Sequence, residues 1–184
     1  MLHFIKRVAR SKEVRRLKQG YSHVSHDFSP VYDNNSTVLI LGSFPSVKSR
    51  EEHFYYGNPK NRFWNVLSSL TGCPRPQSID EKTTFLLSHG IAVWDVIKSC
   101  DIIGSSDSSI RNVVANDISI ILGSADIRLI CGNGATACRL YDRFILPDTG
   151  IEIHRLPSTS PANAARDLDS LVHDWGETIS RLLI

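Results

Sequence analysis

The sequence has no long hydrophobic segment and very few cysteines. None of its apolar runs approaches the roughly 20 residues that a membrane-spanning helix requires, so we expect no membrane partner. The four cysteines contain no C-x-x-C pair of the kind that binds metals or cycles between thiol and disulfide, so no metal site is predicted. Free, buried thiols fit a reducing compartment inside the cell better than a secreted disulfide framework. The 184 residues also lack internal repeats and low-complexity tracts, which favours one folded domain.

Positive charge is concentrated at the start of the chain. Residues 1–20 contain seven lysines and arginines but a single glutamate, a net charge of +6, whereas the whole chain carries +2. Residues 21–184 therefore sum to −4, and we divide the chain into a basic N-terminal arm (1–20) and a single folded domain (21–184). The arm could tether nucleic acid electrostatically, could be an arginine-rich targeting segment, or could be a solvated helix.

Apolar runs and helical periodicities alternate along the domain. Residues 21–37 are predicted to be a polar connector or an ordered wrap, and residues 99–109 a loop. A helix should begin at Asn58-Pro59, which fits an N-cap followed by a first helical proline. This alternation is typical of an α/β fold with a parallel sheet between helical layers. Strands are predicted at residues 38–41, 91–97, 127–131 and 151–156, and the other helices at 81–89, 116–125, 135–144 and over 168–183.

Three polar loops follow three of the predicted strands. They are GSFPS (42–46), GNG (132–134) and LPSTSPAN (156–163). In a parallel sheet all three lie at the carboxyl edge, where ligands of open α/β sheets bind. The first two are weak signals alone, because glycine after a strand usually reflects turn geometry. The third combines small hydroxyl side chains with prolines, and such groups can hold the phosphates of a nucleic acid without reading its sequence.

These motifs together resemble one known superfamily. LILGSFPS, YYGNPKNRFW and LPSTSPANA resemble the uracil-DNA glycosylase superfamily, and more narrowly its hypoxanthine (deoxyinosine) DNA glycosylase branch, which is related to the mismatch-specific uracil/thymine enzymes. The resemblance runs from about residue 28 to the C-terminus and leaves out the basic arm. It implies a three-layer α/β/α sandwich with a short central parallel sheet, a base-flipping pocket, no cofactor, and DNA containing deaminated bases as the partner. We expect a monomer in the cytoplasm (nucleoid) or nucleus, with organelle targeting by the arm left open.

One position departs from the mismatch-specific relatives. Their first motif carries an asparagine between glycine and proline that positions the attacking water, whereas this chain has Phe44 there, and an apolar ring cannot orient water. The resemblance to the hypoxanthine branch indicates Asn61 and Asn133 as the catalytic polar groups instead. An asparagine can hold water through its amide oxygen and donate to the departing base through its nitrogen. Which of the two holds the water is open, and Asn61 could instead only satisfy groups at the helix end.

The remaining candidate residues divide into base-binding and backbone-binding groups. Asp95, near the end of the second predicted strand, could accept a hydrogen bond from N1–H of hypoxanthine, a proton that adenine lacks, or could cap a loop. Phe44, Tyr55 and Tyr56 are candidates to stack on the flipped base, a contact that contributes about 1–3 kcal/mol, or to pack in the core. The predicted DNA-backbone contacts are Ser43, Ser158, Thr159, Ser160 and Asn163.

The favoured function is DNA repair. A monofunctional deoxyinosine DNA glycosylase would flip the deaminated base, with hypoxanthine as the expected substrate, hydrolyse its N-glycosidic bond and leave an abasic site. The main alternative is a non-catalytic nucleic-acid-binding module of the same fold. A third interpretation is a hydrolase or transferase that acts on free nucleosides.

Overall fold

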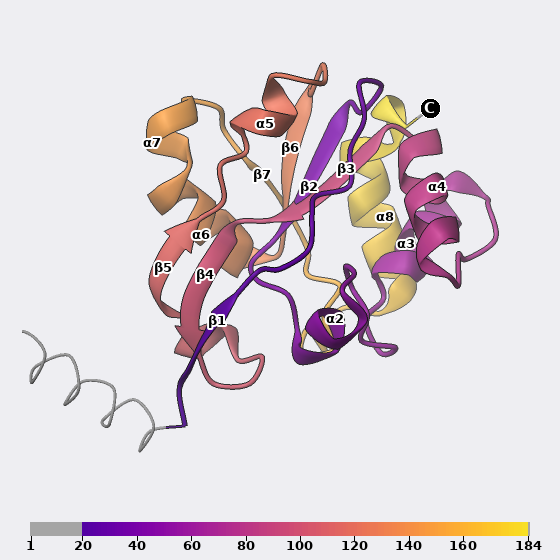
Figure 1. Cartoon of the computed structure of the whole chain (residues 1–184). Coiled ribbons are helices and arrows are strands. Elements are labelled where there is room, and N and C mark those ends of the chain that lie inside the picture. The colour runs from indigo at the N-terminus through magenta and orange to yellow at the C-terminus, as the bar shows by residue number, and fades with distance from the viewer. Residues whose placement is uncertain (1–19, 184) are drawn as a thin grey trace, which may run out of the picture.

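The computed structural model describes residues 20–183 (Figure 1). Its centre is a four-stranded parallel sheet in the order β3-β2-β6-β7. The strands are β2 (Val38–Gly42), β3 (Ile91–Asp95), β6 (Leu129–Asn133) and β7 (His154–Leu156). Except for Gly20, the basic arm predicted at residues 1–20 lies outside the described residues, so the division into an arm and one domain stays a prediction.

Helices cover both faces of this sheet, which confirms the predicted three-layer α/β/α sandwich. α3 (Phe63–Thr71), α4 (Ile79–Ser88) and α8 (Leu168–Ile179) lie on one side, and α6 (Ala135–Phe144) and α7 (Leu146–Thr149) lie on the other (Figure 1). β2 is buried along its whole length, because it lies between two parallel neighbours and beneath helices on both faces. Strands in such a position are typically continuous apolar runs, as VLILG is.

A second, antiparallel sheet departs from the sequence prediction. It consists of β1 (Ser22–Ser25), β4 (Ile97–Ile102) and β5 (Arg111–Ala115), in the order β1-β4-β5. These strands include residues that the sequence assigns to a connector and a loop. The prediction of a single strand over residues 91–97 is also wrong at its C-terminal end, because the chain leaves the parallel sheet after Asp95 and enters the antiparallel sheet at Ile97. β1 and β5 contain no fully buried residue, so they lack the apolar run that identifies a strand in a sequence.

The helix predicted to begin at Asn58-Pro59 begins later, at Phe63. Asn58 closes a separate turn instead. Its side-chain Oδ1 accepts a hydrogen bond from the Lys60 N–H (3.0 Å), and its carbonyl oxygen accepts one from the Asn61 N–H (2.8 Å). Local hydrogen bonds of an asparagine side chain compete with helical ones, which explains why α3 does not extend back to the proline.

Two helices follow their sequence signals closely. α6 spans the predicted residues 135–144. α4 begins with a capping box, in which Ser78 and Glu81 satisfy each other's backbone N–H groups. The chain after α4 turns at Gly90, whose left-handed backbone (φ +67°) fits a glycine just beyond a helix end.

Short helices account for the other differences. The helix predicted at 116–125 is only the single turn α5 (Ser119–Leu122), and α2 (Val47–Glu52) forms directly after the GSFPS loop, where no helix was predicted. Two 3₁₀ turns, η1 (Asp107–Ser109) and η2 (Ser180–Leu182), complete the elements. All four cysteines are free. No helix among residues 20–183 is long and apolar enough to cross a membrane.

Candidate active site

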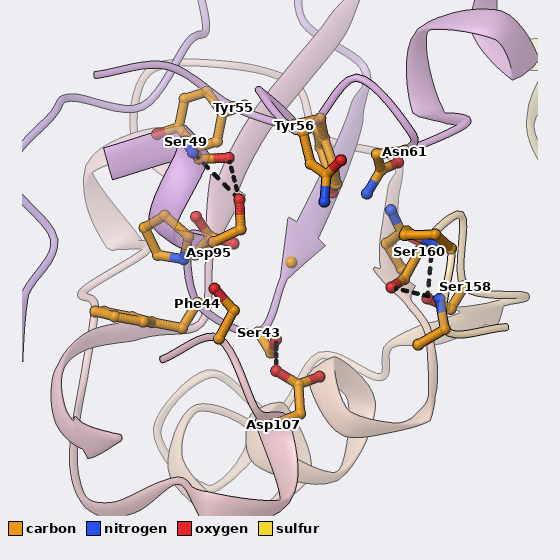
Figure 2. A pocket seen from close by; sticks show the side chains of 18 of the residues that line it. Ser43, Phe44, Ser49, Tyr55, Tyr56, Asn61, Asp95, Asp107, Ser158 and Ser160 are labelled. Atoms are coloured by element: carbon orange, nitrogen blue, oxygen red, sulfur yellow. Dashed lines mark hydrogen bonds between the residues drawn. The ribbon is translucent and has the colours of Figure 1, made fainter. Parts of the chain in front are cut away.

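The carboxyl ends of the parallel strands open into a pocket of about 380 Å³ (Figure 2). β2, β3 and β6 end there at Gly42, Asp95 and Asn133, so the parallel topology brings the strand-end loops together. The predicted site residues line this pocket with two exceptions, Thr159 and Asn163. Segments far apart in the sequence therefore converge on one cavity.

Gly42 and Asp95 form the floor of this pocket, here called the strand floor. The Asp95 carboxylate lies over Gly42, since a Cβ atom at position 42 would collide with Asp95 Oδ1. Asp95 Oδ2 is hydrogen-bonded to His26 Nε2 (3.0 Å), and the Asp95 carbonyl oxygen accepts from Asn116 Nδ2 (2.9 Å). One carboxylate oxygen is thus anchored, while the other faces the space above the glycine.

Phe44 and Tyr55 line the same side of the pocket but have different surroundings (Figure 2). Tyr55 is buried, and its hydroxyl donates to the Ser29 carbonyl oxygen (2.9 Å). These contacts make Tyr55 part of the core behind the pocket. The Phe44 ring also lies against the cavity, and the Arg50 guanidinium is 5.6 Å from the centre of that ring.

Tyr56 presents a hydroxyl group rather than a free ring face. Its ring stacks nearly parallel on Phe63, with 3.7 Å between ring centres and an angle of 14°. The hydroxyl oxygen is buried and makes no hydrogen bond of normal geometry to any residue in 20–183. Burial, and then the Asp95 carboxylate, raise the pKa of Tyr56 well above its ordinary value, against a smaller opposing effect of the Asn133 amide. The hydroxyl therefore keeps its proton and can act as a donor.

Asn61 lies between the Asn58 turn and α3. Its Oδ1 accepts a hydrogen bond from the Phe63 N–H (3.0 Å), so the side chain does satisfy a group at the start of the helix. Its amide nitrogen is turned toward the pocket (Figure 2). The two alternatives for Asn61 are therefore compatible, because one end of the amide organises α3 and the other end faces the cavity.

Asn133 connects two of the strand-end loops. Its Oδ1 accepts from the Thr159 N–H (2.9 Å) and its Nδ2 donates to Thr159 Oγ1 (2.9 Å). Thr159 has no exposed surface, so its hydroxyl faces Asn133 inside the protein rather than a ligand outside it. The prediction of a phosphate contact by the Thr159 side chain does not fit this position, since local sequence cannot show which hydroxyl of the loop turns inward.

Asn61, Ser158 and Ser160 form the opposite side of the pocket, here called the loop wall (Figure 2). The Arg62 guanidinium holds this loop by donating to backbone carbonyl oxygens. It contacts Ser160 (2.9 Å), Asn163 (3.0 Å) and Arg166. Asn163 also donates from Nδ2 to the Ser158 carbonyl oxygen (2.8 Å), so it shapes the loop and does not line the cavity.

Comparison with known proteins identifies the family of this chain. The family model of the uracil DNA glycosylase superfamily matches residues 29–176. The chain belongs to this superfamily. It is 39% identical over 142 residues to a hypoxanthine DNA glycosylase of Methanosarcina acetivorans (76% of this chain and 89% of the relative). It is 37% identical over 157 residues to a hypoxanthine DNA glycosylase of Methanosarcina barkeri (84% and 97%).

A solved structure shows the same fold. The solution NMR structure of a candidate uracil DNA glycosylase from Methanosarcina acetivorans superposes with a TM-score of 0.72 at 35% sequence identity. The match covers 84% of this chain and 96% of that chain. The family model and this structure together confirm the resemblance seen in the three motifs.

This superfamily member also has pocket residues that the motifs do not reveal. The serine-rich loop between β4 and β5 reaches the cavity, and there Asp107 Oδ1 accepts a hydrogen bond from the Ser43 hydroxyl (2.9 Å). Desolvation raises the pKa of the Asp107 carboxyl, and the Ser43 bond opposes that shift. His26 and Arg62 act from behind the pocket, on Asp95 and on the loop wall. A cluster of serines around an aspartate is a weak sequence signal for a pocket residue, and His26 and Arg62 have no sequence signal at all.

No group of three or more His, Cys, Asp or Glu in the described part of the chain could hold a metal ion.

Proposed function

We propose that this protein is a DNA glycosylase that flips hypoxanthine out of DNA and hydrolyses its N-glycosidic bond. The observation that carries the proposal is the strand floor, where a carboxylate oxygen of Asp95 and the buried hydroxyl of Tyr56 both lie within 4 Å of the Cβ position of Gly42. Hypoxanthine carries an N1–H donor beside an O6 acceptor. These two groups complement the Asp95 carboxylate oxygen, which accepts, and the Tyr56 hydroxyl, which donates. Two relatives that bear the name hypoxanthine DNA glycosylase support the same assignment.

The reaction breaks the bond between N9 of the base and C1′ of the sugar, and it adds water at C1′. Positive charge develops on the sugar and negative charge on the departing base, so preorganised polar groups lower the barrier. We assign Asn61 to the attacking water, which its cavity-facing amide nitrogen would hold by donating to the water oxygen, because Oδ1 is engaged by the Phe63 N–H at the start of α3. Asn133 keeps the Thr159 loop in place beside it. The products are free hypoxanthine and an abasic site.

The other residues have binding roles in this proposal. Phe44 stacks on the flipped base, since its ring lines the cavity in place of a water-orienting asparagine. Ser158 and Ser160 contact the DNA backbone from the loop wall. Tyr55 supports the pocket from the core, and Tyr56 contributes its hydroxyl rather than a stacking face.

The test is excision from labelled duplexes that contain inosine, uracil, xanthine or a thymine mismatch, followed by alkaline cleavage at abasic sites. We expect hypoxanthine to be released faster than uracil, because Phe44 cannot orient water as the asparagine of uracil-processing relatives does. Faster release of uracil would show that the substrate assignment is wrong. Duplex binding without abasic sites would indicate the non-catalytic module, and cleavage of free deoxyinosine alone would indicate a nucleoside hydrolase.

A further inference from the structure

A buried histidine lies directly behind the strand floor. His26 follows β1, and its Nε2 lies 3.0 Å from Asp95 Oδ2, with side chains that are only 2% and 8% exposed. A carboxylate oxygen can only accept, so the imidazole Nε2 is the donor. His26 does not line the pocket itself, and it precedes the residues matched by the family model. Its contact with the site therefore passes through Asp95.

The antiparallel sheet fixes this histidine in place. The His26 N–H donates to the Lys98 carbonyl oxygen (2.7 Å), which continues the pairing of β1 with β4. Its ring packs on Phe28, with 4.2 Å between ring centres, and lies 5.9 Å from the ring of Tyr55. A ring held by backbone pairing and by aromatic neighbours has little freedom to turn. The donor therefore holds Asp95 Oδ2 and leaves Oδ1 directed at the space above Gly42.

We propose that His26 is a positioning residue for base recognition, which holds the Asp95 carboxylate so that Oδ1 accepts the N1–H of flipped hypoxanthine. This inference rests on the proposed function. The Tyr56 hydroxyl then donates to O6 of the same base. Adenine presents a lone pair at N1 and an amino group at position 6, so it would oppose both groups. No residue of β1 lines the pocket, yet the antiparallel sheet contributes to the choice of base, because the pairing of β1 with β4 holds His26.

Four substitutions in the full-length chain separate the hydrogen bond from the packing of the ring. His26→Phe keeps an aromatic ring without a donor, and we expect single-turnover hypoxanthine excision to fall about 10- to 100-fold, the order lost with a hydrogen bond to a charged group. His26→Gln places an amide N–H near the position of Nε2 and should recover excision to within about fivefold of the parent. His26→Asn is too short to reach Asp95 and should resemble His26→Phe. His23→Phe is the control. His23 lies in β1, three residues before His26, and pairs with Asp101 of β4 (2.9 Å), which does not line the pocket.

A double-mutant cycle with Asp95→Asn completes the test. In the Asp95→Asn background, His26→Phe should cause no further loss, because the carboxylate that it positions is already absent. A structural role would instead lower excision by the same factor in both backgrounds and would leave His26→Gln no better than His26→Asn. Either of those results would overturn the inference. If His26→Phe does not fold, the comparison of His26→Gln with His26→Asn tests the inference by itself. Failure of the parent protein to release hypoxanthine would overturn the proposed function as well, whereas normal release with no His26 effect would overturn only this inference.

Discussion

The strand floor and the loop wall enclose the same pocket, but the protein holds them in different ways. The floor consists of Gly42 and Asp95 at the ends of neighbouring parallel strands, and the carboxylate is fixed by a buried histidine. The loop wall has no regular secondary structure, and Arg62 and Asn133 hold it through hydrogen bonds to its backbone and to Thr159. A rigid floor suits recognition of a base edge. A loop held by a few polar contacts suits a DNA backbone whose sequence is not read.

The largest effect should come from Asn61, the proposed catalytic group on the loop wall. Asn61→Ala is expected to lower single-turnover hypoxanthine excision by about 10²–10³, the order lost when one preorganised polar group is removed. Duplex binding should change little, since the backbone contacts are assigned to the serines. Asn65→Ala, one turn further along α3, is the matched control and should be mild. Parental activity in Asn61→Ala would move the assignment to Asn133.

Gly42→Ala tests how rigid the strand floor is. The added Cβ would collide with Asp95 Oδ1, and the His26 bond resists the shift that would relieve the collision. We expect a loss of about 10- to 100-fold in hypoxanthine excision, because a misplacement of about 1 Å that originates away from the reacting atoms can cost about 10²-fold. Affinity for a duplex should stay near that of the parent. An equal loss of binding would mean that the floor and the loop wall do not function separately.

Arg62→Gln should weaken the loop wall without touching the floor. The substitution removes hydrogen bonds from a charged donor to several loop carbonyls, and we expect the Kd for a duplex to rise about tenfold. The ratio of hypoxanthine to uracil excision should stay constant, because we propose that the base edge contacts the strand floor and not the loop wall. Arg128→Gln is the control, since the Arg128 side chain is exposed and pairs with Asp126 rather than with a carbonyl of the loop wall. A changed base preference in Arg62→Gln would show that the loop wall also selects the base.

Smaller changes are expected for the serines of the loop wall. Ser158→Ala and Ser160→Ala should each raise the Kd for a duplex about threefold, as the loss of one neutral hydrogen bond predicts. Thr159→Val should instead lower the melting temperature, because the buried hydroxyl bonds Asn133. If Thr159→Val changed only DNA affinity, the loop hydroxyl would face the ligand after all.

The smallest effect on catalysis should follow deletion of residues 1–20. At saturating protein the excision rate should not change, because the pocket lies within the described domain. The Kd should depend less steeply on salt concentration, since phosphate contacts by lysine and arginine release counterions. An unchanged salt dependence would favour the targeting segment or the solvated helix. The measurement is a series of binding isotherms at several salt concentrations for both proteins.

The elements that bury continuous apolar faces can be predicted from the sequence. The run VLILG specifies a strand covered on both sides, and helical periodicity specifies α6 and α4 to within a residue or two. Because parallel strands place their carboxyl ends at one edge, the three loop motifs also located the pocket with Asn133 in it, the end of the second predicted strand added Asp95, and the resemblance added Asn61. The parallel sheet therefore follows from local patterns and the edge that holds the pocket from one topological rule, whereas the family came from the resemblance of three motifs and the strand order only from the structure.

The pairing of the polar residues, in contrast, depends on the three-dimensional arrangement of the chain. His26 and Asp95 are 69 residues apart, and Arg62 holds carbonyl oxygens about 100 residues away. Thr159 is turned inward by Asn133, although its neighbours in the loop face the cavity. Hydrophobic periodicity records which face of an element is buried, because every residue on that face contributes to it. A single long-range hydrogen bond has no such repetition, so the antiparallel sheet and the support behind the pocket leave no pattern in the sequence.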